Sequence, residues 1–343
     1  MFANRLKKRL SHLRKWAKRT RVAAFRLYDR DIPEIPLVLD AYGANGAIDM
    51  ACGSLYKRPY EKDAAEEALW LELMRGAASQ ALEIAQDSIM VKSRERQRGD
   101  GMGGNRTQYE KLSCQKLIRE IPEGDFIFKV NVSDYLDTGL FLDRRLLRRM
   151  IQDDSEGRRV LNLFCYTSSF SVYAAGGGAA STCSVDLSNT YLGWSRENFS
   201  LNSIASGSMR MEDYCRRGNA HGNTLVKADV PVFIRHALEK RMQWDSIILD
   251  PPAFSNSSMA EADFDLLRDY ESLITNCLAL LARGGKLWFS ASSRSFKADA
   301  AALASSLGGR YPGIKITDIG DKIIDEDFKG KKMPRTFILE PGA

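Results

Sequence analysis

The chain has few cysteines and histidines and no long apolar run. Its six cysteines lie far apart among 343 residues, without a C-x-x-C pair, and only three histidines accompany them. These numbers and spacings do not match the patterns of structural zinc sites or disulfide frameworks. We therefore expect no bound metal, and we expect the cysteines to be reduced and partly buried. No stretch approaches the ~18 apolar residues of a membrane span, and residues 1–30 lack a signal-like segment. The composition predicts a cytoplasmic protein.

Acidic residues are nearly missing from the N-terminal region. Residues 1–30 contain eleven Lys or Arg side chains against one acid, Asp29, and residues 92–119 contain eight against three. The whole chain has a net charge of only +6, so the remainder is acidic. A basic face on an acidic body is typical of proteins that approach a polyanion.

The span Asn4–Thr20 predicts a basic amphipathic helix. Leu6, Leu10 and Leu13 recur at helical spacing, with Lys and Arg around them. Such a helix can bind phosphates, lie on a membrane surface, or be a solvated face that docks one apolar stripe. The narrow stripe, with Trp16 as its only large aromatic, favours nucleic acid.

The rest of the N-terminal part predicts a mixed α+β domain. A glycine-rich loop, Arg98–Arg106, is not followed by a helix that begins with Lys-Ser/Thr, so we interpret it as a flexible basic loop and not as a phosphate-binding P-loop. The other predicted elements are a hairpin of Leu37–Tyr42 and Ala47–Cys52, a helix Glu61–Gln86, and strands Ser88–Lys92 and Asp125–Val132.

From residue 158 onward, strands and helices alternate. This alternation predicts a doubly wound, Rossmann-like parallel sheet, with a last antiparallel pair, Ile314–Ile319 and Thr336–Leu339. We place the boundary between Asp137 and Gly157, and assign residues 1–140 to an RNA-binding domain and residues 141–343 to the α/β domain. The alternating elements are Val160–Phe164 (strand), Phe170–Ala175 (helix), Thr182–Val185 (strand), Thr190–Leu201 (helix), Thr224–Lys227 (strand), Val232–Lys240 (helix), Ser246–Leu249 (strand), Phe264–Ala282 (helix) and Lys286–Ser290 (strand).

Three of the predicted parallel strands are followed by an acid: Asp186, Asp229 and Asp250. The carboxyl edge of such a sheet is where ligands bind, and an acid after the second strand can accept hydrogen bonds from ribose hydroxyls. A dinucleotide would also need a glycine-rich approach to pyrophosphate, whereas residues 165–170 contain no glycine. The pattern therefore favours a phosphate-free nucleoside cofactor, S-adenosylmethionine (SAM).

The segment Asp250-Pro251-Pro252-Ala253-Phe254 is stiff and poor in hydrogen-bond donors. It can present a carboxylate, carbonyls and one ring to a flat heterocycle. The alternative is a simple strand-ending turn, for which Asp and Pro are common choices.

Several motifs resemble those of the class I, SAM-dependent rRNA large-subunit methyltransferases, and most closely the RlmK-type half of RlmK/RlmL enzymes, which methylates guanine N7 in 23S rRNA. The resemblance runs over nearly the whole chain. It implies 23S rRNA or a large-subunit precursor as substrate and, because the RlmL half has no counterpart in this sequence, a separate RlmL-like partner. The motifs are Asn162-Leu-Phe-Cys-Tyr-Thr167, Val185-Asp-Leu-Ser188, Asp250-Pro-Pro-Ala-Phe-Ser-Asn-Ser257, Asp137-Thr-Gly-Leu-Phe-Leu-Asp-Arg144 and Lys92-Ser-Arg-Glu-Arg-Gln-Arg98.

The resemblance also implies roles for single residues. Asp186 would bind the ribose, Asp229 the adenine edge, and the turn Phe164–Ser168 the methionine end of SAM, with Asp143 near the same pocket. Ser168 stands where this family usually has glycine, and its β-carbon would crowd the cofactor and weaken SAM binding. The full set of expected cofactor residues is Asn162, Phe164, Tyr166, Thr167, Ser168, Asp186, Leu187, Asp229 and Asp143.

The methylated atom decides the chemistry. Carbon-5 of cytosine needs a cysteine thiolate, and the segment Phe289–Arg294 after the fifth strand has none. Guanine N7 has a lone pair and no proton, so the enzyme needs alignment and not a base. We therefore expect Asp250 to hold the base, Pro251 and Pro252 to stiffen the loop, and Phe254 to stack on the base, unless Phe254 is a core residue. The alternatives are cytosine-C5 or guanine-N2 methylation, and a non-catalytic RNA-binding or ribosome assembly factor.

Overall fold

The chain forms two compact units. The computed structural model describes residues 1–44, 47–57, 62–94, 113, 115–218, 222–255, 263–293 and 295–342. The first unit comprises Met1–Leu142 together with Glu326–Lys329, and the second comprises Asp143–Asp325 together with Gly330–Ala343. The change from one unit to the other after Leu142 lies within the predicted interval. The return of residues 326–329 to the first unit was not predicted.

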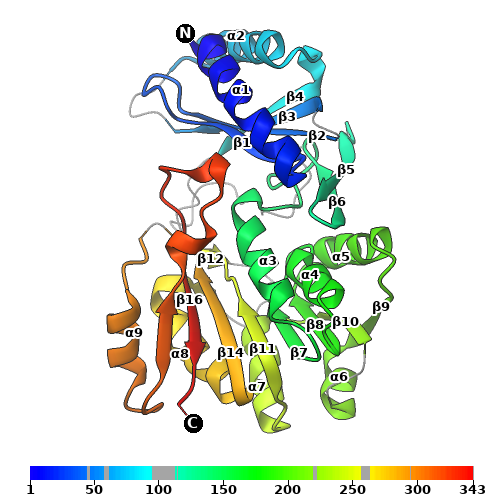
Figure 1. Cartoon of the computed structure of the whole chain (residues 1–343), viewed down its shortest axis with the longest axis vertical. Helices are drawn as coiled ribbons and strands as arrows, with labels where there is room; N and C mark the ends of the chain where they lie inside the picture. The colour runs from blue at the N-terminus through cyan, green and yellow to red at the C-terminus, as the bar shows by residue number, and fades with distance from the viewer. Residues whose placement is uncertain are drawn as a thin grey trace. The chain divides into compact units, whose positions relative to one another are not determined.

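The first unit is built on a four-stranded sheet of order β1-β2-β3-β4 (Figure 1). The predicted hairpin is confirmed, because β2 and β3 pair antiparallel, although residues 45–46 and the predicted loop Arg98–Arg106 lie outside the described residues. Strands β1 and β5 were not predicted. The elements are α1 (Phe2–Thr20), β1 (Ala24–Asp29), β2 (Leu37–Ala44), β3 (Ala47–Tyr56), α2 (Ala64–Leu82), η1 (Gln86–Ser88), β4 (Ile89–Arg94), β5 (Ile118–Glu123) and β6 (Phe126–Asn131).

Helix α1 forms where the sequence predicts it. Its apolar stripe, which includes Leu6, Leu10 and Leu13, is buried in one core with residues of α2 and the sheet. The helix ends at Arg21, which takes the left-handed conformation with φ of 55° and donates its N–H to the carbonyl of Ala17. Because the apolar stripe is buried, the lysines and arginines on the opposite face of α1 are exposed to solvent.

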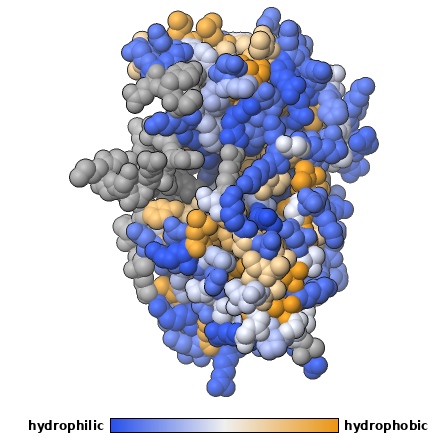
Figure 2. Space-filling model, turned by 90° about the vertical axis from the view of Figure 1, so that its left-hand side faces the viewer, coloured by the Kyte–Doolittle hydropathy of each residue, from blue (hydrophilic) through white to orange (hydrophobic). Residues whose placement is uncertain are grey.

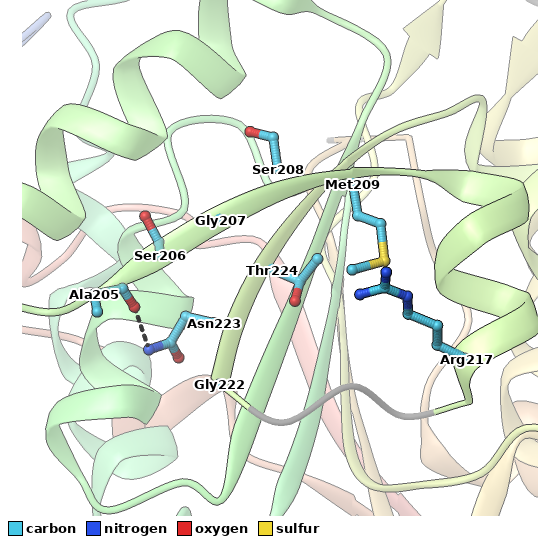
Figure 3. A pocket seen from close by; sticks show the side chains of 9 residues that line it. All are labelled: Ala205, Ser206, Gly207, Ser208, Met209, Arg217, Gly222, Asn223 and Thr224. Atoms are coloured by element: carbon cyan, nitrogen blue, oxygen red, sulfur yellow. Dashed lines mark hydrogen bonds between the residues drawn. The ribbon is translucent and has the colours of Figure 1, made fainter.

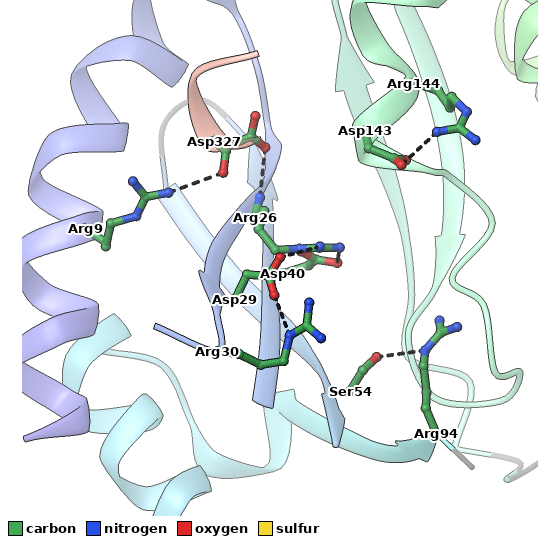
Figure 4. Close-up of polar contacts among 10 residues, drawn as sticks. All are labelled: Arg9, Arg26, Asp29, Arg30, Asp40, Ser54, Arg94, Asp143, Arg144 and Asp327. Carbon is green, nitrogen blue, oxygen red and sulfur yellow. Dashed lines mark hydrogen bonds and ion pairs between the residues drawn. The ribbon is translucent and has the colours of Figure 1, made fainter. Parts of the chain in front are cut away.

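The segment Glu326–Lys329 completes the first unit. Asp327 is fully buried, and its carboxylate accepts the backbone N–H of Arg26 at 2.9 Å. The guanidinium of Arg26 lies 5.0 Å from the centre of the Phe328 ring. Arg9 of α1 donates to the carbonyl of Asp327 at 3.3 Å (Figure 4). A short piece of chain from near the C-terminus is thereby fastened to α1 and β1.

The second unit is the predicted doubly wound sheet, with strand order β15-β16-β14-β11-β7-β8-β10-β9. Strands β7, β8, β10, β11 and β14 run parallel, and β16 pairs antiparallel with both β14 and β15. Helices α3, α4 and α5 pack on one face, and α7, α8 and α9 on the other (Figure 1). Both faces of the central strands are thus covered, which explains why Leu161 and Ile247 on one face and Val160 and Ile248 on the other are all buried.

The element bounds of the second unit differ from the prediction in detail. The predicted helix from Phe264 begins later, because Phe264–Asp265 forms the short strand β13 opposite Phe254–Ser255. Elements α3, α6, α9 and β9 were not predicted. The unit contains η2 (Leu142–Arg144), α3 (Arg145–Asp153), β7 (Arg159–Leu163), α4 (Ser169–Gly176), β8 (Ser181–Asp186), α5 (Asn189–Leu201), β9 (Ser206–Arg210), α6 (Met211–Arg217), β10 (Gly222–Lys227), α7 (Val230–Glu239), β11 (Trp244–Leu249), β12 (Phe254–Ser255), α8 (Leu266–Ala279), β14 (Leu281–Ala291), α9 (Ala300–Leu307), β15 (Lys315–Asp318), η3 (Gly320–Ile323) and β16 (Arg335–Glu340).

Two expectations about the whole chain can be compared with the described residues. None of their helices is both long and apolar enough to span a membrane. Their cysteines, Cys52, Cys165, Cys183, Cys215 and Cys277, are all free and buried, as predicted for reduced thiols; Cys114 lies outside the described part.

Candidate active site

Parallel pairing brings the predicted acids to one edge of the second unit. Leu163 of β7 is aligned with Leu249 of β11 and with Val185 of β8, and Val185 is aligned with Val226 of β10. The residues that follow these aligned positions include Phe164, Asp186 and Asp250, with Asp229 two residues beyond Lys227 of β10. The carboxyl ends of four neighbouring strands therefore present the acids and the β7–α4 turn side by side.

The turn between β7 and α4 is held in an unusual backbone conformation. Phe164, Tyr166 and Ser168 have φ values of 56°, 53° and 59°. Each is a left-handed conformation that costs a non-glycine residue roughly 1–2 kcal/mol. Strain of this kind persists only where surrounding contacts enforce it, and it concentrates at binding and catalytic sites.

Contacts from β8 and α5 enforce the turn. The N–H of Tyr166 donates to Asp186 Oδ2 at 2.9 Å, and Asn198 Nδ2 donates to the carbonyl of Thr167 at 2.9 Å. Ser195 Oγ donates to the carbonyl of Tyr166 at 3.1 Å. Sequence reasoning missed Ser195 and Asn198, because they lie well inside helix α5 and their partners are more than twenty residues away.

Ser168 takes a backbone conformation that suits glycine better than serine. Its backbone is left-handed, a conformation that glycine adopts at little cost. Its side chain is fully buried, and the hydroxyl donates to Ser195 Oγ at 2.8 Å. The serine is thus accommodated through a hydrogen bond to α5, and its effect on cofactor affinity stays a prediction.

Asp186 is a nearly buried carboxylate at the end of β8, with 9% of its surface exposed. Its two oxygens accept the backbone N–H groups of Ser188 and Tyr166, both at 2.9 Å. Burial raises the pKa of this carboxyl to about 6, although these hydrogen bonds and one from the N–H of Leu187 lower it. A carboxylate offers roughly four lone-pair positions, so one acceptor position is left for a ligand.

Of the remaining expected cofactor residues, some lie at the carboxyl edge of the sheet and one does not. Asp229 and Leu187 are half-buried at the edge, and Asp229 begins α7, accepting the N–H of Phe233 at its carbonyl. The ring of Phe164 packs on that of Phe264, with centroids 5.4 Å apart. Asn162 is not brought to the edge, because it lies inside β7 with 1% exposure and its amide donates to Ser171 Oγ of α4.

Asp250 is locked in a bidentate ion pair that the sequence did not reveal. Arg144 donates from Nε to Asp250 Oδ2 and from Nη2 to Asp250 Oδ1, both at 2.9 Å. The same guanidinium donates from Nη1 to Asp143 Oδ2 at 2.8 Å (Figure 4) and from Nη2 to Ser292 Oγ at 2.8 Å. Both oxygens of Asp250 thus already accept from Arg144, and the expected role of Asp250 in holding a base stays a prediction.

The rest of the Asp-Pro-Pro-Ala-Phe segment leaves the strand as predicted. Pro251 is buried and Pro252 half-buried, and β11 ends at Leu249. Phe254 is half-buried and is not among the residues of the main core that surrounds β7, β11 and α8. This placement favours a ring that is available at the edge over one that only fills the core.

Two buried thiols of the second unit are poor nucleophiles: Cys165 lies in the turn after β7, whereas Cys277 lies near the end of α8, beside the start of β11 and away from the carboxyl edge. Burial raises the pKa of Cys165 well above its usual value, with a further contribution from the charge of Asp186, and burial also raises the pKa of Cys277. A protonated, buried thiol cannot add to a base. Within the described part of the chain, no cluster of His, Cys, Asp and Glu is arranged to hold a metal ion.

A separate pocket of about 520 Å³ lies at the β9 side of the sheet, where Figure 3 shows Arg217 pointing toward Met209. It contains none of the expected site residues, and we do not assign it to the candidate site. Its lining residues are Ala205, Ser206, Gly207, Ser208, Met209, Arg217, Gly222, Asn223 and Thr224.

Comparison with solved structures shows the fold. The chain aligns with SMU.776, a protein described as a methyltransferase and solved in complex with SAH, at a TM-score of 0.71 and 22% identity, over 99% of this chain and 80% of that one. It aligns with the SAM-dependent methyltransferase from Agrobacterium tumefaciens at a TM-score of 0.55 and 20% identity, over 89% and 86% of the two chains.

Comparison of sequences shows the family. Residues 53–301 match the model of the S-adenosylmethionine-dependent methyltransferases. The chain is 42% identical over 340 residues to ribosomal RNA large subunit methyltransferase K/L of Pseudomonas aeruginosa, covering 99% of this chain but only 42% of that protein. It is 40% identical over 338 residues to ribosomal RNA large subunit methyltransferase K of Neisseria meningitidis, covering 98% and 86%. The chain therefore belongs to the S-adenosylmethionine-dependent methyltransferases and, among them, to the family of the large-subunit ribosomal RNA methyltransferase K.

Proposed function

We propose that the protein methylates the N7 ring nitrogen of a guanine in 23S rRNA, as free RNA or in a large-subunit precursor. The proposal rests on the arrangement of residues at the carboxyl edge of the sheet in the second unit. Asp186, Asp229 and the Asp250-Pro-Pro segment follow neighbouring parallel strands beside a strained turn. The family supplies the reaction class, and the chemistry of the edge supports the choice of atom.

The residues at this edge fit S-adenosylmethionine. Asp186 keeps an acceptor position for a ribose hydroxyl, and Asp229 lies at the neighbouring strand end for the adenine edge. The turn Phe164–Ser168 would hold the methionine end. When bound, the cofactor supplies an activated methyl group on a sulfonium. Its positive charge suits an edge at which three carboxylates, Asp186, Asp229 and Asp250, follow neighbouring strands.

The locked Asp250 supports a ring nitrogen as the acceptor. Methylation of an exocyclic amine must release a proton, whereas guanine N7 has a free lone pair and releases none. A carboxylate held at both oxygens by a guanidinium is a poor proton acceptor, and neither Cys165 nor Cys277 can act as a thiolate. These three groups are thus suited to orient a base and not to deprotonate one. Phe254 would stack on the base, which contributes roughly 1–3 kcal/mol.

Helix α1 supports RNA binding by the first unit. Its exposed cations point away from the apolar stripe within a sector of about 140°, counted at 100° per residue. Among the described residues none of these side chains has an ionic or hydrogen-bonding partner, and hydrophilic side chains cover most of this unit on the face drawn in Figure 2. Unpaired cations of this kind are available for phosphates. They are Lys7, Lys8, Arg14, Lys15, Lys18 and Arg19.

The decisive experiment is nucleoside analysis. Unmodified 23S rRNA is incubated with the full chain and isotopically labelled SAM, digested, and its nucleosides are separated by mass spectrometry. Labelled 7-methylguanosine is expected. Labelled 5-methylcytidine or N2-methylguanosine would overturn the choice of atom. No labelled nucleoside, together with no SAM binding at millimolar concentration by calorimetry, would favour the non-catalytic RNA-binding alternative.

A separate partner is a further proposal. The chain spans about two fifths of the length of the K/L relatives, so a protein equivalent to their remaining part is a candidate to act with this one. Co-elution of the two purified proteins in size-exclusion chromatography is expected, and independent elution at micromolar concentration would contradict it. Cytoplasmic location likewise stays a prediction.

A further inference from the structure

Arg144 joins three segments of the second unit through one buried guanidinium. It is 4% exposed, and each of its three nitrogens donates a hydrogen bond. The partners are Asp143 in η2, Asp250 directly after β11, and Ser292 directly after β14.

The cluster is more than a buried ion pair of the core. The Asp143 side chain is 27% exposed and that of Asp250 is 13% exposed, while Arg144 lies beneath them at 5%. Both acids thus face outward from a cation that solvent does not reach. Two carboxylates and one guanidinium leave a net charge of −1 on the outer side.

The acids retain acceptor positions toward the outside. Asp143 Oδ1 accepts no hydrogen bond from any residue that the structure describes, since only its Oδ2 is engaged by Arg144. Asp250 accepts two bonds from Arg144 and a longer one of 3.3 Å from Ser292. Of roughly four lone-pair positions on a carboxylate, one remains. The cluster therefore offers two adjacent acceptors at fixed positions.

We propose that Arg144 is a positioning residue for methyl transfer: it holds Asp143 and Asp250 as a rigid pair of acceptors for the N1–H and 2-amino donors of the target guanine. These donors lie on the ring edge opposite N7, so their capture leaves N7 facing away from the acids. Adenine presents an acceptor at N1 and is repelled. The inference rests on the proposed function and adds to it the group that selects guanine.

The test compares Arg144→Gln and Arg144→Lys with Arg145→Gln, a matched control. Arg145 is the next residue, is similarly buried, and pairs with Asp325 at 2.7 Å, outside the cluster. We expect Arg144→Gln to lower kcat about 100-fold, the scale of an ångström-sized misplacement, while the Kd for SAM changes less than about threefold. Arg144→Lys, which keeps the charge but cannot donate two parallel hydrogen bonds to Asp250, should recover only part of kcat.

Asp143→Asn provides a second test that keeps Arg144 in place and leaves an amide oxygen to accept from its Nη1. We expect it to fold as the parent protein and to lower kcat/KM for guanine-containing RNA about tenfold. An unchanged kcat/KM in Asp143→Asn, or an Arg144→Gln variant with kcat like that of Arg145→Gln, would overturn the inference. These outcomes differ from failure of the proposed function, in which the parent protein itself produces no labelled 7-methylguanosine.

Discussion

Raising the pH should weaken the fold of this protein through a single carboxyl group, Asp186. Burial raises its pKa from an ordinary value of 3.8 to about 6. Between these values the folded state binds more protons at this group than the unfolded state does. Its contribution to the free energy of unfolding is therefore largest at low pH and is lost as the pH rises through about 6. A gap of about two pKa units corresponds to about 3 kcal/mol.

The variant Asp186→Asn isolates this contribution, because an amide of nearly the same shape does not titrate. Denaturant unfolding of both proteins is measured at intervals from about pH 4 to pH 7, and the free energy of the variant is subtracted from that of the parent. Titration of all other groups cancels in this difference. We expect the difference to fall by about 3 kcal/mol over the interval. A flat or rising difference would refute the reasoning, since the hydrogen bonds from Ser188 and Tyr166 would then outweigh burial.

The proposed role of Asp186 in cofactor binding adds a trend of opposite sign. An ionised carboxylate accepts a hydrogen bond from ribose more strongly than a protonated one does. The affinity for SAM should therefore rise through about pH 6 while stability falls. Calorimetry across this range tests the prediction, and an affinity that does not change with pH in the parent protein would contradict the ribose contact.

Three further predictions concern turnover, cofactor affinity and RNA binding. Asp250→Asn should lower kcat about 100-fold and change the Kd for SAM little; a shift mainly in Kd would instead place Asp250 against the cofactor. Ser168→Gly relieves a left-handed serine but removes its bond to Ser195, so the free energy of unfolding should change by less than about 1 kcal/mol. The same variant should bind SAM more tightly in calorimetry, and an unchanged Kd would show that this side chain does not crowd the cofactor. Changing Lys7, Lys8 and Lys15 to Gln should reduce the salt slope of RNA binding by up to about three units, whereas the exposed cations Arg283, Arg310 and Lys322 of the second unit, changed together, should leave it unaltered.

The sheet that carries the site was predictable because its strands are local apolar runs. Ile247, Ile248 and Leu249 predict a strand covered on both faces, and the alternation with helices predicts parallel neighbours. Parallel order alone then brings the following acid, Asp250, to the edge with Asp186. No contact between distant residues had to be known for this step.

The partners of these acids were not predictable in the same way. Arg144 and Asp250 are 106 residues apart, and no local pattern marks them as a pair. The available hint was an arginine within the apolar stretch Leu140–Leu147, where a charged side chain needs a partner. Strand β9 was missed because Ser206–Arg210 is a polar edge strand, whereas the alanine-rich α9, capped by Asp299, gave a signal that could have been used.

The place of residues 326–329 has a consequence for synthesis. Translation proceeds from the N-terminus, so α1 and the first sheet emerge long before Asp327 and Phe328 exist. Until they arrive, the backbone N–H of Arg26 lacks its carboxylate acceptor and its guanidinium lacks the ring beneath it. The first unit therefore reaches its final form only after residues 326–329 have been made, and residues 143–325 of the second unit precede them in the order of synthesis.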